Sequence, residues 1–230
     1  MKLFVKKFVI FCLIFLPSIF AIDTQIVHAD QYDDFINAGL QHSVISNADF
    51  IDTNSLSLSE IQQFLVNKGS YLKDYVDYSD AGRGRSAAEI IWDASQGKYE
   101  AGGSYNGIII DETTKTVNPM IILVYLQKEQ SLISRTVYNE WAMIASMGYN
   151  CYAGVSGDYN DNNCKDIYEG FTKQVENGAW QLRYNYEAAG MDASWWNTYY
   201  PTQPKYQVGV TITAGRSEER RVGKECRSRW

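Results

Sequence analysis

The chain has 230 residues, enough for one domain of ordinary size, and 45% of them are apolar while 21% are charged, which excludes a disordered protein. A formal charge of -6 argues against a nucleic-acid-binding protein, which would carry a basic face. Two histidines and four cysteines that do not cluster argue against a zinc site, so no metal or cofactor is expected.

Residues 1–29 have the pattern of a secretory signal peptide. Three lysines within the first seven residues precede an apolar run (8–21), and the triplet ending at Ala29 matches a cleavage site. Cleavage would start the mature protein near Asp30 and would place it outside the cell or on the cell wall. The alternative is an uncleaved membrane anchor, for which the apolar run is short and is interrupted by Pro17.

Residues 216–230, RSEERRVGKECRSRW, look foreign to the domain. They resemble the in-frame translation of a common sequencing adapter, so we expect a non-native tail and a natural chain cut off at Gly215. The alternative is a natural basic tail that binds anionic surfaces. What is left, residues 30–215, is expected to be a single domain. It is more acidic than the whole chain and rich in tyrosine, a composition that permits binding of neutral sugars.

Cys151 and Cys164 are the two cysteines of this domain. In an exported protein such a pair indicates one disulfide, closing a loop with little apolar material. A loop of this size would contribute about 3 kcal/mol in the chain-entropy model. The alternative, two free thiols in a redox role, lacks the C-x-x-C spacing.

The spacing of apolar residues predicts a mainly α (α+β) domain with few short strands. Capping-box sequences at Ser57 and Ser86 predict two helices, ended by Gly69 and Gly97, and explain Glu89 as a capping residue. The other expected segments are an irregular start (30–56), a loop with one small strand (98–116), helices over 118–133, 137–147 and 167–189, and a loop followed by one strand (195–213).

The segment NPMIILVYLQKEQSLIS, residues 118–134, is the most informative of these. Asn118 is a good N-cap and Pro119 a good first helical residue. Residues 120–126 are apolar on every side, which predicts a helix buried at the centre of the domain.

Glu129 lies near the carboxyl end of that helix. Burial, the negative end of the helix dipole and the scarcity of donors all favour the neutral acid, which can donate a proton at neutral pH. Lys128 is adjacent, but neighbouring helical side chains are expected to point apart. The alternative is that Glu129 faces water beside Lys128 and Gln130.

Three segments, LQKEQSLIS, MGYNC and YEGFTKQVENGAW, are together similar to a family of secreted bacterial cell-wall proteins with a lysozyme-like domain of transglycosylase or glucosaminidase type. The resemblance covers most of residues 56–185. It implies that Glu129 is the catalytic acid, that Ser131 is the hydroxyl residue that follows it, and that Met147-Gly148-Tyr149 is the later glycine–aromatic motif. That motif departs from lytic transglycosylases because it lacks their Gly-Leu-Met-Gln run.

The reaction implied is cleavage of the β-1,4 glycan strand of peptidoglycan. A hydrolase needs a second carboxylate, for which Glu140, Asp158 and Asp161 are candidates, and Asp158 is preferred because the disulfide loop could overhang the cleft. A transglycosylase needs none, since a hydroxyl of the sugar attacks. Tyr149 and Tyr152 could stack on sugar rings, with ordinary packing as the alternative.

The predicted substrate-binding residues are Ser131, Tyr149, Tyr152 and Asp158. Trp141, Phe171 and Trp180 are assigned to the core. A weaker pattern of EF-hand type places Asp158, Asn160, Asn162, Asp166 and Glu169 at calcium-ligand positions. Asn163 replaces the usual glycine of that pattern and Lys165 an apolar residue, so a solvated acidic loop is the alternative.

We therefore expect a secreted, monomeric enzyme that acts on peptidoglycan, with no nucleic-acid partner and no membrane partner after signal cleavage. A non-catalytic glycan-binding module and a structural or adhesive surface protein are the alternatives. A cysteine or serine peptidase is not expected, because His42 is the one histidine that remains after the signal peptide.

Overall fold

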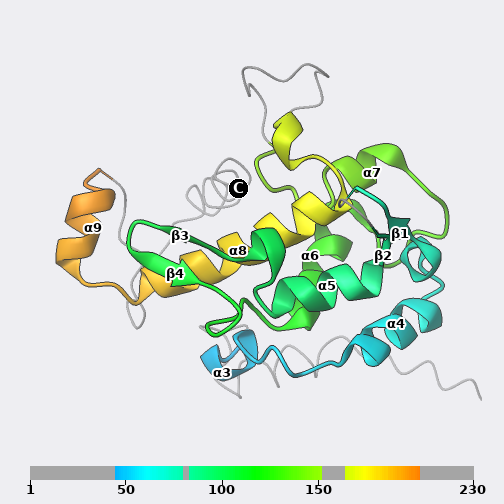
Figure 1. Ribbon diagram of the computed structural model, residues 1–230, viewed down its shortest axis with the longest axis horizontal. Coiled ribbons are helices and arrows are strands. Elements are labelled where there is room, and N and C mark those ends of the chain that lie inside the picture. Colours follow the sequence, from blue (N-terminus) through cyan, green and yellow to red (C-terminus); the bar gives the residue numbers. More distant parts are fainter. Residues whose placement is uncertain (1–44, 80–82, 152–163, 203–230) are drawn as a thin grey trace, which may run out of the picture. The chain divides into compact units, whose positions relative to one another are not determined.

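The computed structural model describes residues 45–79, 83–151 and 164–202, and about half of these residues are helical (Figure 1). The α-helices are α3 (Asn47–Phe50), α4 (Leu58–Asn67), α5 (Ala87–Ser95), α6 (Pro119–Gln130), α7 (Glu140–Ile144), α8 (Phe171–Ala189) and α9 (Ala193–Tyr199). Short 3-10 helices are η2 (Tyr71–Asp74), η3 (Tyr99–Ala101) and η4 (Asp166–Tyr168). The expectation of a mainly α domain is confirmed.

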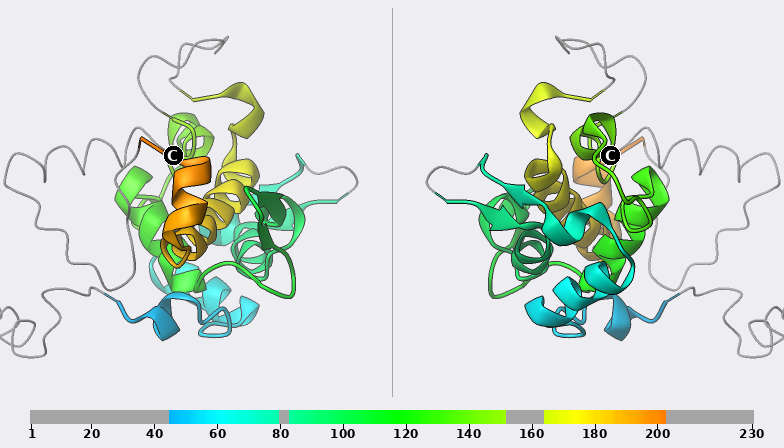
Figure 2. Two further views of the ribbon diagram at one scale, coloured as in Figure 1. Left: turned by 90° about the vertical axis from the view of Figure 1, so that its left-hand side faces the viewer. Right: turned by 90° about the vertical axis from the view of Figure 1, so that its right-hand side faces the viewer.

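Two small antiparallel sheets complete the described part. Strand β1 (Val76–Asp77) pairs with β2 (Arg85–Ser86), and β3 (Gly103–Tyr105) pairs with β4 (Ile108–Ile110). Asn106 and Gly107 both have positive φ and form the tight turn of the second hairpin. In both views of Figure 2 this hairpin lies on the opposite side of α8 from α6.

Helix α5 is the central helix of the fold, because it packs against α4, α6 and α8. Seven of its nine residues are buried. Several of them are alanines, whose small side chains allow neighbouring helices to approach closely. Its buried Asp93 is paired with Arg85, which lies on β2 and is itself buried. Burial of a charged group is tolerated here because an opposite charge accompanies it.

Helix α6 was expected to be this central helix, and that prediction is wrong. Ile122, Leu123 and Leu126 are buried, but Val124 is 54% exposed and Met120 also faces outward. An all-apolar sequence therefore does not bury this helix on every side. One of its faces borders an open groove instead.

Helix α8 begins at Phe171 rather than at residue 167, because Gly170 has a φ of 95° and interrupts the preceding turn. Gly170 has no side chain to cap the helix. The Asp77 carboxylate of β1 takes that role: its Oδ2 accepts hydrogen bonds from Thr172 N (3.3 Å) and Thr172 Oγ1 (2.7 Å).

Other predicted elements differ at their ends or in type. Residues 98–116 hold two strands instead of one, and α7 is shorter than the expected 137–147. Residues 193–199 form α9 instead of a loop, because Asp192 caps the helix through Trp195 N (2.8 Å). The strand expected after residue 205 and the whole of residues 1–44 lie outside the described residues.

The three aromatic residues that were assigned to the core differ in how deeply they are buried. Phe171 is fully buried, as expected. Trp180 is half-buried and packs against a second, smaller core formed by Ile108, Ile110, Tyr184, Ala188 and Trp196. Trp141 is 60% exposed, so its assignment to the core is wrong. It lies on the short helix α7, which buries Ala142 and Met143 instead.

Glu89 forms only one of the two hydrogen bonds of the expected capping box. Its backbone N–H donates to Ser86 Oγ (3.2 Å), but its carboxylate accepts from Arg83 (2.6 Å) instead of reaching back to the cap. This hydrogen bond, together with the positive charge of Arg83, lowers the pKa of the Glu89 carboxyl. In the described part of the chain, no helix is long and apolar enough to span a bilayer.

The link between β1 and α8 makes a pH-dependent contribution to stability. Partial burial opposes the charge of Asp77, but hydrogen bonds from Thr172 and Ser79 outweigh it and lower the pKa of the Asp77 carboxyl. Asp77→Ala should lower the free energy of unfolding at pH 7 by about 1–2 kcal/mol, the usual loss for a helix cap. This contribution is present above about pH 4 and is lost as the pH falls through the lowered pKa.

Urea unfolding of wild type and Asp77→Ala at pH 7 and pH 3 checks this expectation. The difference between the two proteins should be smaller at pH 3. Asp74→Ala is the control, because the Asp74 side chain is 75% exposed and its removal should change the stability by less than about 0.5 kcal/mol. An equal loss for Asp77→Ala at both pH values would contradict the assignment.

Candidate functional site

Glu129 continues the buried stripe of α6. It lies seven residues after Ile122 and three after Leu126, which places all three on one side of the helix. The two apolar side chains are fully buried, while the Glu129 side chain keeps 23% of its surface exposed. The carboxyl group therefore lies at the end of the core, where a small part of it can still be reached from solvent.

The chain leaves α6 directly after this residue. Ser131 ends the helix in the left-handed conformation, with a φ of 55°, and its N–H donates to Gln127 O (2.9 Å). A left-handed residue with such a bond is the αL type of helix ending, and Leu132 N donates in addition to Leu126 O (3.0 Å). Ser131 is exposed and lies two positions from Glu129. Its role as a substrate-binding hydroxyl stays a prediction.

A glycine turn lies against the Glu129 carboxyl group. A Cβ placed on Gly148 would lie 3.3 Å from Glu129 Oε2 and 3.6 Å from Cδ, and Gly148 has a φ of 71°. Both features favour glycine at this position, since a side chain would be strained and would crowd the carboxylate. The two segments linked by the resemblance, LQKEQSLIS and MGYNC, thus meet at these two residues.

The segment 147–149 bridges the end of α6 and the helix α8. Met147 packs on Gly178 of α8, where a Cβ would lie 2.9 Å from the Met147 Sδ. Tyr149 N donates to Gln174 Oε1 (2.9 Å), also on α8. The glycine that contacts Glu129 is therefore flanked on both sides by contacts to α8.

Adjacent helical side chains are expected to point apart, but the Lys128 side chain turns toward Glu129. Its Nζ lies 2.9 Å from Glu129 Oε1, because the long and flexible lysine side chain folds back along the helix end. The Lys128 side chain is 62% exposed. Such a solvent-exposed ion pair contributes less than about 1 kcal/mol, so a ligand could displace the ammonium group.

Tyr149 is 7% exposed and packs edge-on against Tyr168, with ring centroids 4.9 Å apart. Burial and the neighbouring Tyr168 raise the pKa of Tyr149 to about 12, so its hydroxyl stays neutral. This packing favours the alternative, a structural role near the disulfide, and the stacking of Tyr149 on a sugar ring stays a prediction.

Glu100 is a charged residue near this turn that the sequence did not single out. It lies on η3, forms an ion pair with Lys173 and accepts from Asn177 Nδ2 (2.9 Å). Its charge contributes to the raised pKa of Tyr149, which places it close to the turn. A spacing of more than forty residues between Glu100 and the turn gives no sequence signal for this neighbourhood.

A buried charge cluster holds η3 in place. Arg85 NH2 donates to Glu176 Oε1 (2.6 Å), and Glu176 Oε2 accepts from Glu100 N (3.4 Å). The Arg85 guanidinium also lies over the Tyr99 ring, 4.2 Å from its centroid. The sequence does not single out Glu176, which the structure shows bonded to both Arg85 and the backbone of η3.

The cysteine pair forms the expected disulfide, Cys151–Cys164. Lys165 N donates to Asn150 O (3.3 Å), which joins the two ends of the loop beside the glycine turn. The loop itself, with the predicted site residues Tyr152, Asp158 and Asp161, lies outside the described residues.

Most of the predicted calcium-binding loop likewise lies outside the described residues. Its first ligands, Asp158, Asn160 and Asn162, lie outside the described residues, and Asp166 and Glu169 lie on and after η4. No cluster of metal-ligating residues occurs in the described part of the chain. Glu140, the remaining candidate for a second carboxylate, is exposed at the first position of α7.

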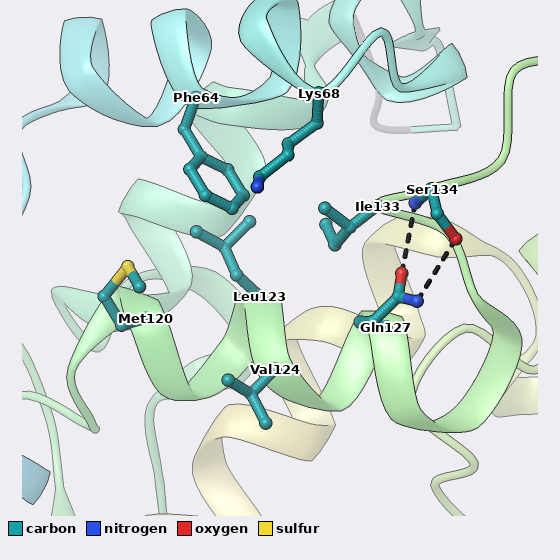
Figure 3. A pocket seen from close by; sticks show the side chains of 8 residues that line it. All are labelled: Phe64, Lys68, Met120, Leu123, Val124, Gln127, Ile133 and Ser134. Atoms are coloured by element: carbon teal, nitrogen blue, oxygen red, sulfur yellow. Dashed lines mark hydrogen bonds between the residues drawn. The ribbon is translucent and has the colours of Figure 1, made fainter. Parts of the chain in front are cut away.

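A groove of about 430 Å³ lies between α4 and α6 (Figure 3). Phe64 of α4 and Lys68, which follows α4, face α6, and two hydrogen bonds between Gln127 and Ser134 close one end. The other lining residues are Met120, Leu123, Val124 and Ile133. Glu129 is not among the lining residues.

Comparison with models of known protein families, with curated proteins and with solved structures finds no match for the chain. The chemistry of the site therefore rests on the geometry around Glu129. That geometry consists of a partly buried carboxyl group, a glycine turn in contact with it and an exposed lysine at its rim.

The contact between Gly148 and Glu129 can be tested with a matched pair of variants. Gly69 has a φ of 62° and no atom within 4 Å of its Cβ position, so Gly69→Ala introduces backbone strain alone. Gly148→Ala adds a methyl group beside the carboxylate. Both should lose about 1–2 kcal/mol of stability, the strain of a left-handed alanine.

Carbon NMR of the glutamate carboxyl groups distinguishes the two variants. The Glu129 Cδ resonance should shift in Gly148→Ala and stay unchanged in Gly69→Ala. If it is unchanged in both variants, the turn does not touch the carboxyl group in solution.

Proposed function

We propose that this chain is a secreted, monomeric, lysozyme-like protein that cleaves the β-1,4 glycan strand of peptidoglycan, with Glu129 as the general acid. The observation that carries the proposal is the placement of Glu129 at the end of α6, partly buried and in contact with Gly148. A glycine at this place adds no side chain that would crowd the acid. The resemblance of LQKEQSLIS and MGYNC to cell-wall enzymes supports the same function.

The proposed reaction begins with protonated Glu129. The acid donates its proton to the glycosidic oxygen while the bond from that oxygen to C1 breaks with its electron pair, and positive charge develops on the sugar ring. Attack at C1 by water gives a reducing end, whereas attack by a hydroxyl of the same sugar gives an anhydro end. The attacking oxygen loses a proton, which restores the acid.

Lys128 borders this step, because its ammonium group lies 2.9 Å from Glu129 Oε1. A sugar bound over Glu129 would displace the exposed lysine side chain into solvent. Since such a surface pair is worth less than about 1 kcal/mol, the displacement is a small part of a substrate-binding energy. The proposal therefore requires Lys128 to move on binding, and it does not require a rearrangement of the core.

The ion pair also favours a second candidate function, a glycan-binding module without turnover. In that case Glu129 transfers no proton and serves as the partner of Lys128. Val137 and Tyr138, which precede α7, and Trp141 on α7 each expose more than half of their surface. Aromatic faces such as those of Tyr138 and Trp141 stack on sugar rings. The two candidates share a ligand and differ in whether Glu129 transfers a proton.

Glu129→Gln separates the two candidates, because the amide keeps the shape of the side chain but cannot act as a general acid. A zymogram with purified peptidoglycan should clear with wild type and fail to clear with Glu129→Gln. In solution the rate should fall at least about 100-fold, the usual contribution of a general acid. The control is Glu112→Gln, which removes the same charge from an exposed turn and should clear as wild type does.

Pull-down on the same peptidoglycan gives the second readout. Binding that survives Glu129→Gln, together with clearing by wild type, supports the enzyme. Binding without any clearing by wild type supports the glycan-binding module. Equal clearing by wild type and Glu129→Gln would overturn the assignment of Glu129.

A further inference from the structure

Gln174 is a fully buried polar residue in the first turns of α8. Its Oε1 accepts from Tyr149 N (2.9 Å), and its Nε2 donates to Tyr149 O (2.9 Å) and to Tyr168 O (2.7 Å). A glutamine amide has two donor hydrogens, so these bonds occupy both of them. The side chain thus holds two backbone segments that are distant in sequence from each other.

Gln174 holds both backbone polar groups of Tyr149, the residue directly after Gly148. On the other side of the glycine, Gly148 N donates to Ala145 O (3.0 Å). With both flanking peptide groups fixed, Gly148 is kept at its positive φ and against the Glu129 carboxyl group. Apolar packing alone would not fix the rotation of these peptide groups, because it is not directional.

We propose that Gln174 is a positioning residue for Glu129, an inference that rests on the proposed function and extends it. Gln174 acts through the backbone of the 148–149 turn. Without its amide, the turn moves away from α6 and the Glu129 side chain gains rotamers that do not point at the scissile bond. Catalytic groups need placement within a fraction of an ångström, so such freedom lowers the rate of proton transfer.

Gln174→Met tests the proposal, since methionine fills a similar volume without hydrogen-bonding groups. A general loss of stability is controlled by Gln96→Met. Gln96 is also buried and donates to Thr53 O and Ser95 Oγ, both at 3.0 Å, but it does not contact the 148–149 turn. Both variants should be less stable than wild type, and only the first should affect the site.

The kinetic readout uses solubilised glycan strands and folded protein. For Gln174→Met we expect kcat to fall about tenfold or more, while KM stays within about twofold of wild type. The reason is that the variant misplaces the acid and leaves the substrate contacts unchanged. Gln96→Met should keep wild-type kcat. If Gln174→Met fails to fold, Gln174→Glu replaces it, since it keeps the acceptor for Tyr149 N and loses the amide donors.

A structural readout is independent of activity. Glu129 Cγ lies 3.8 Å from the Cβ position of Gly148, so a Gly148 α-proton and the Glu129 γ-protons should give a nuclear Overhauser effect. It should be present in wild type and Gln96→Met and weakened or lost in Gln174→Met. An unchanged effect together with unchanged kcat in folded Gln174→Met would overturn the positioning role. If wild type is inactive, the proposed function fails, and the Overhauser effect alone decides whether Gln174 positions Glu129.

Discussion

Three buried polar side chains in the first two turns of α8 tie this helix to three other segments, one of which is the turn beside Glu129. Thr172 bonds to strand β1, Gln174 to the 148–149 turn, and Glu176 to Arg85 and the start of η3. Each of the three is at most 2% exposed, so its hydrogen bonds must be made inside the protein. Loss of any one of these contacts leaves a buried polar group without a hydrogen bond. Alternative arrangements of these segments are therefore unfavourable.

Because of these contacts, the surroundings of the Glu129 carboxyl group depend on α8 as well as on its own helix, α6. Helix α6 supplies the residue and the direction of its side chain, but the surface that the carboxyl group meets is supplied by Gly148, which α8 holds through Tyr149. The lysine on the opposite side is exposed and weakly held. One side of the carboxyl group is thus fixed and the other open, an arrangement suited to a preorganised acid.

The sequence predicts those helices whose ends are set by capping residues close by in the chain. The capping box at Ser57, the cap and proline that start α6 and the disulfide all appear as expected. It does not reveal that α5 is central, because the burial of Asp93 depends on Arg85 of a neighbouring strand. The resemblance names Glu129 and the motif with Gly148 but does not predict their approach. The roles of Gln174 and Glu100 depend on contacts across tens of residues, which periodicity does not report.

The measurement that tests the central claim most directly is mass spectrometry of purified glycan strands after incubation with the protein. If Glu129 transfers a proton to the glycosidic oxygen, wild type releases short fragments cut at the β-1,4 bond, and their anhydro or reducing ends identify the attacking group. Strands that bind the protein and keep their full mass would contradict the account and would identify the chain as a glycan-binding module.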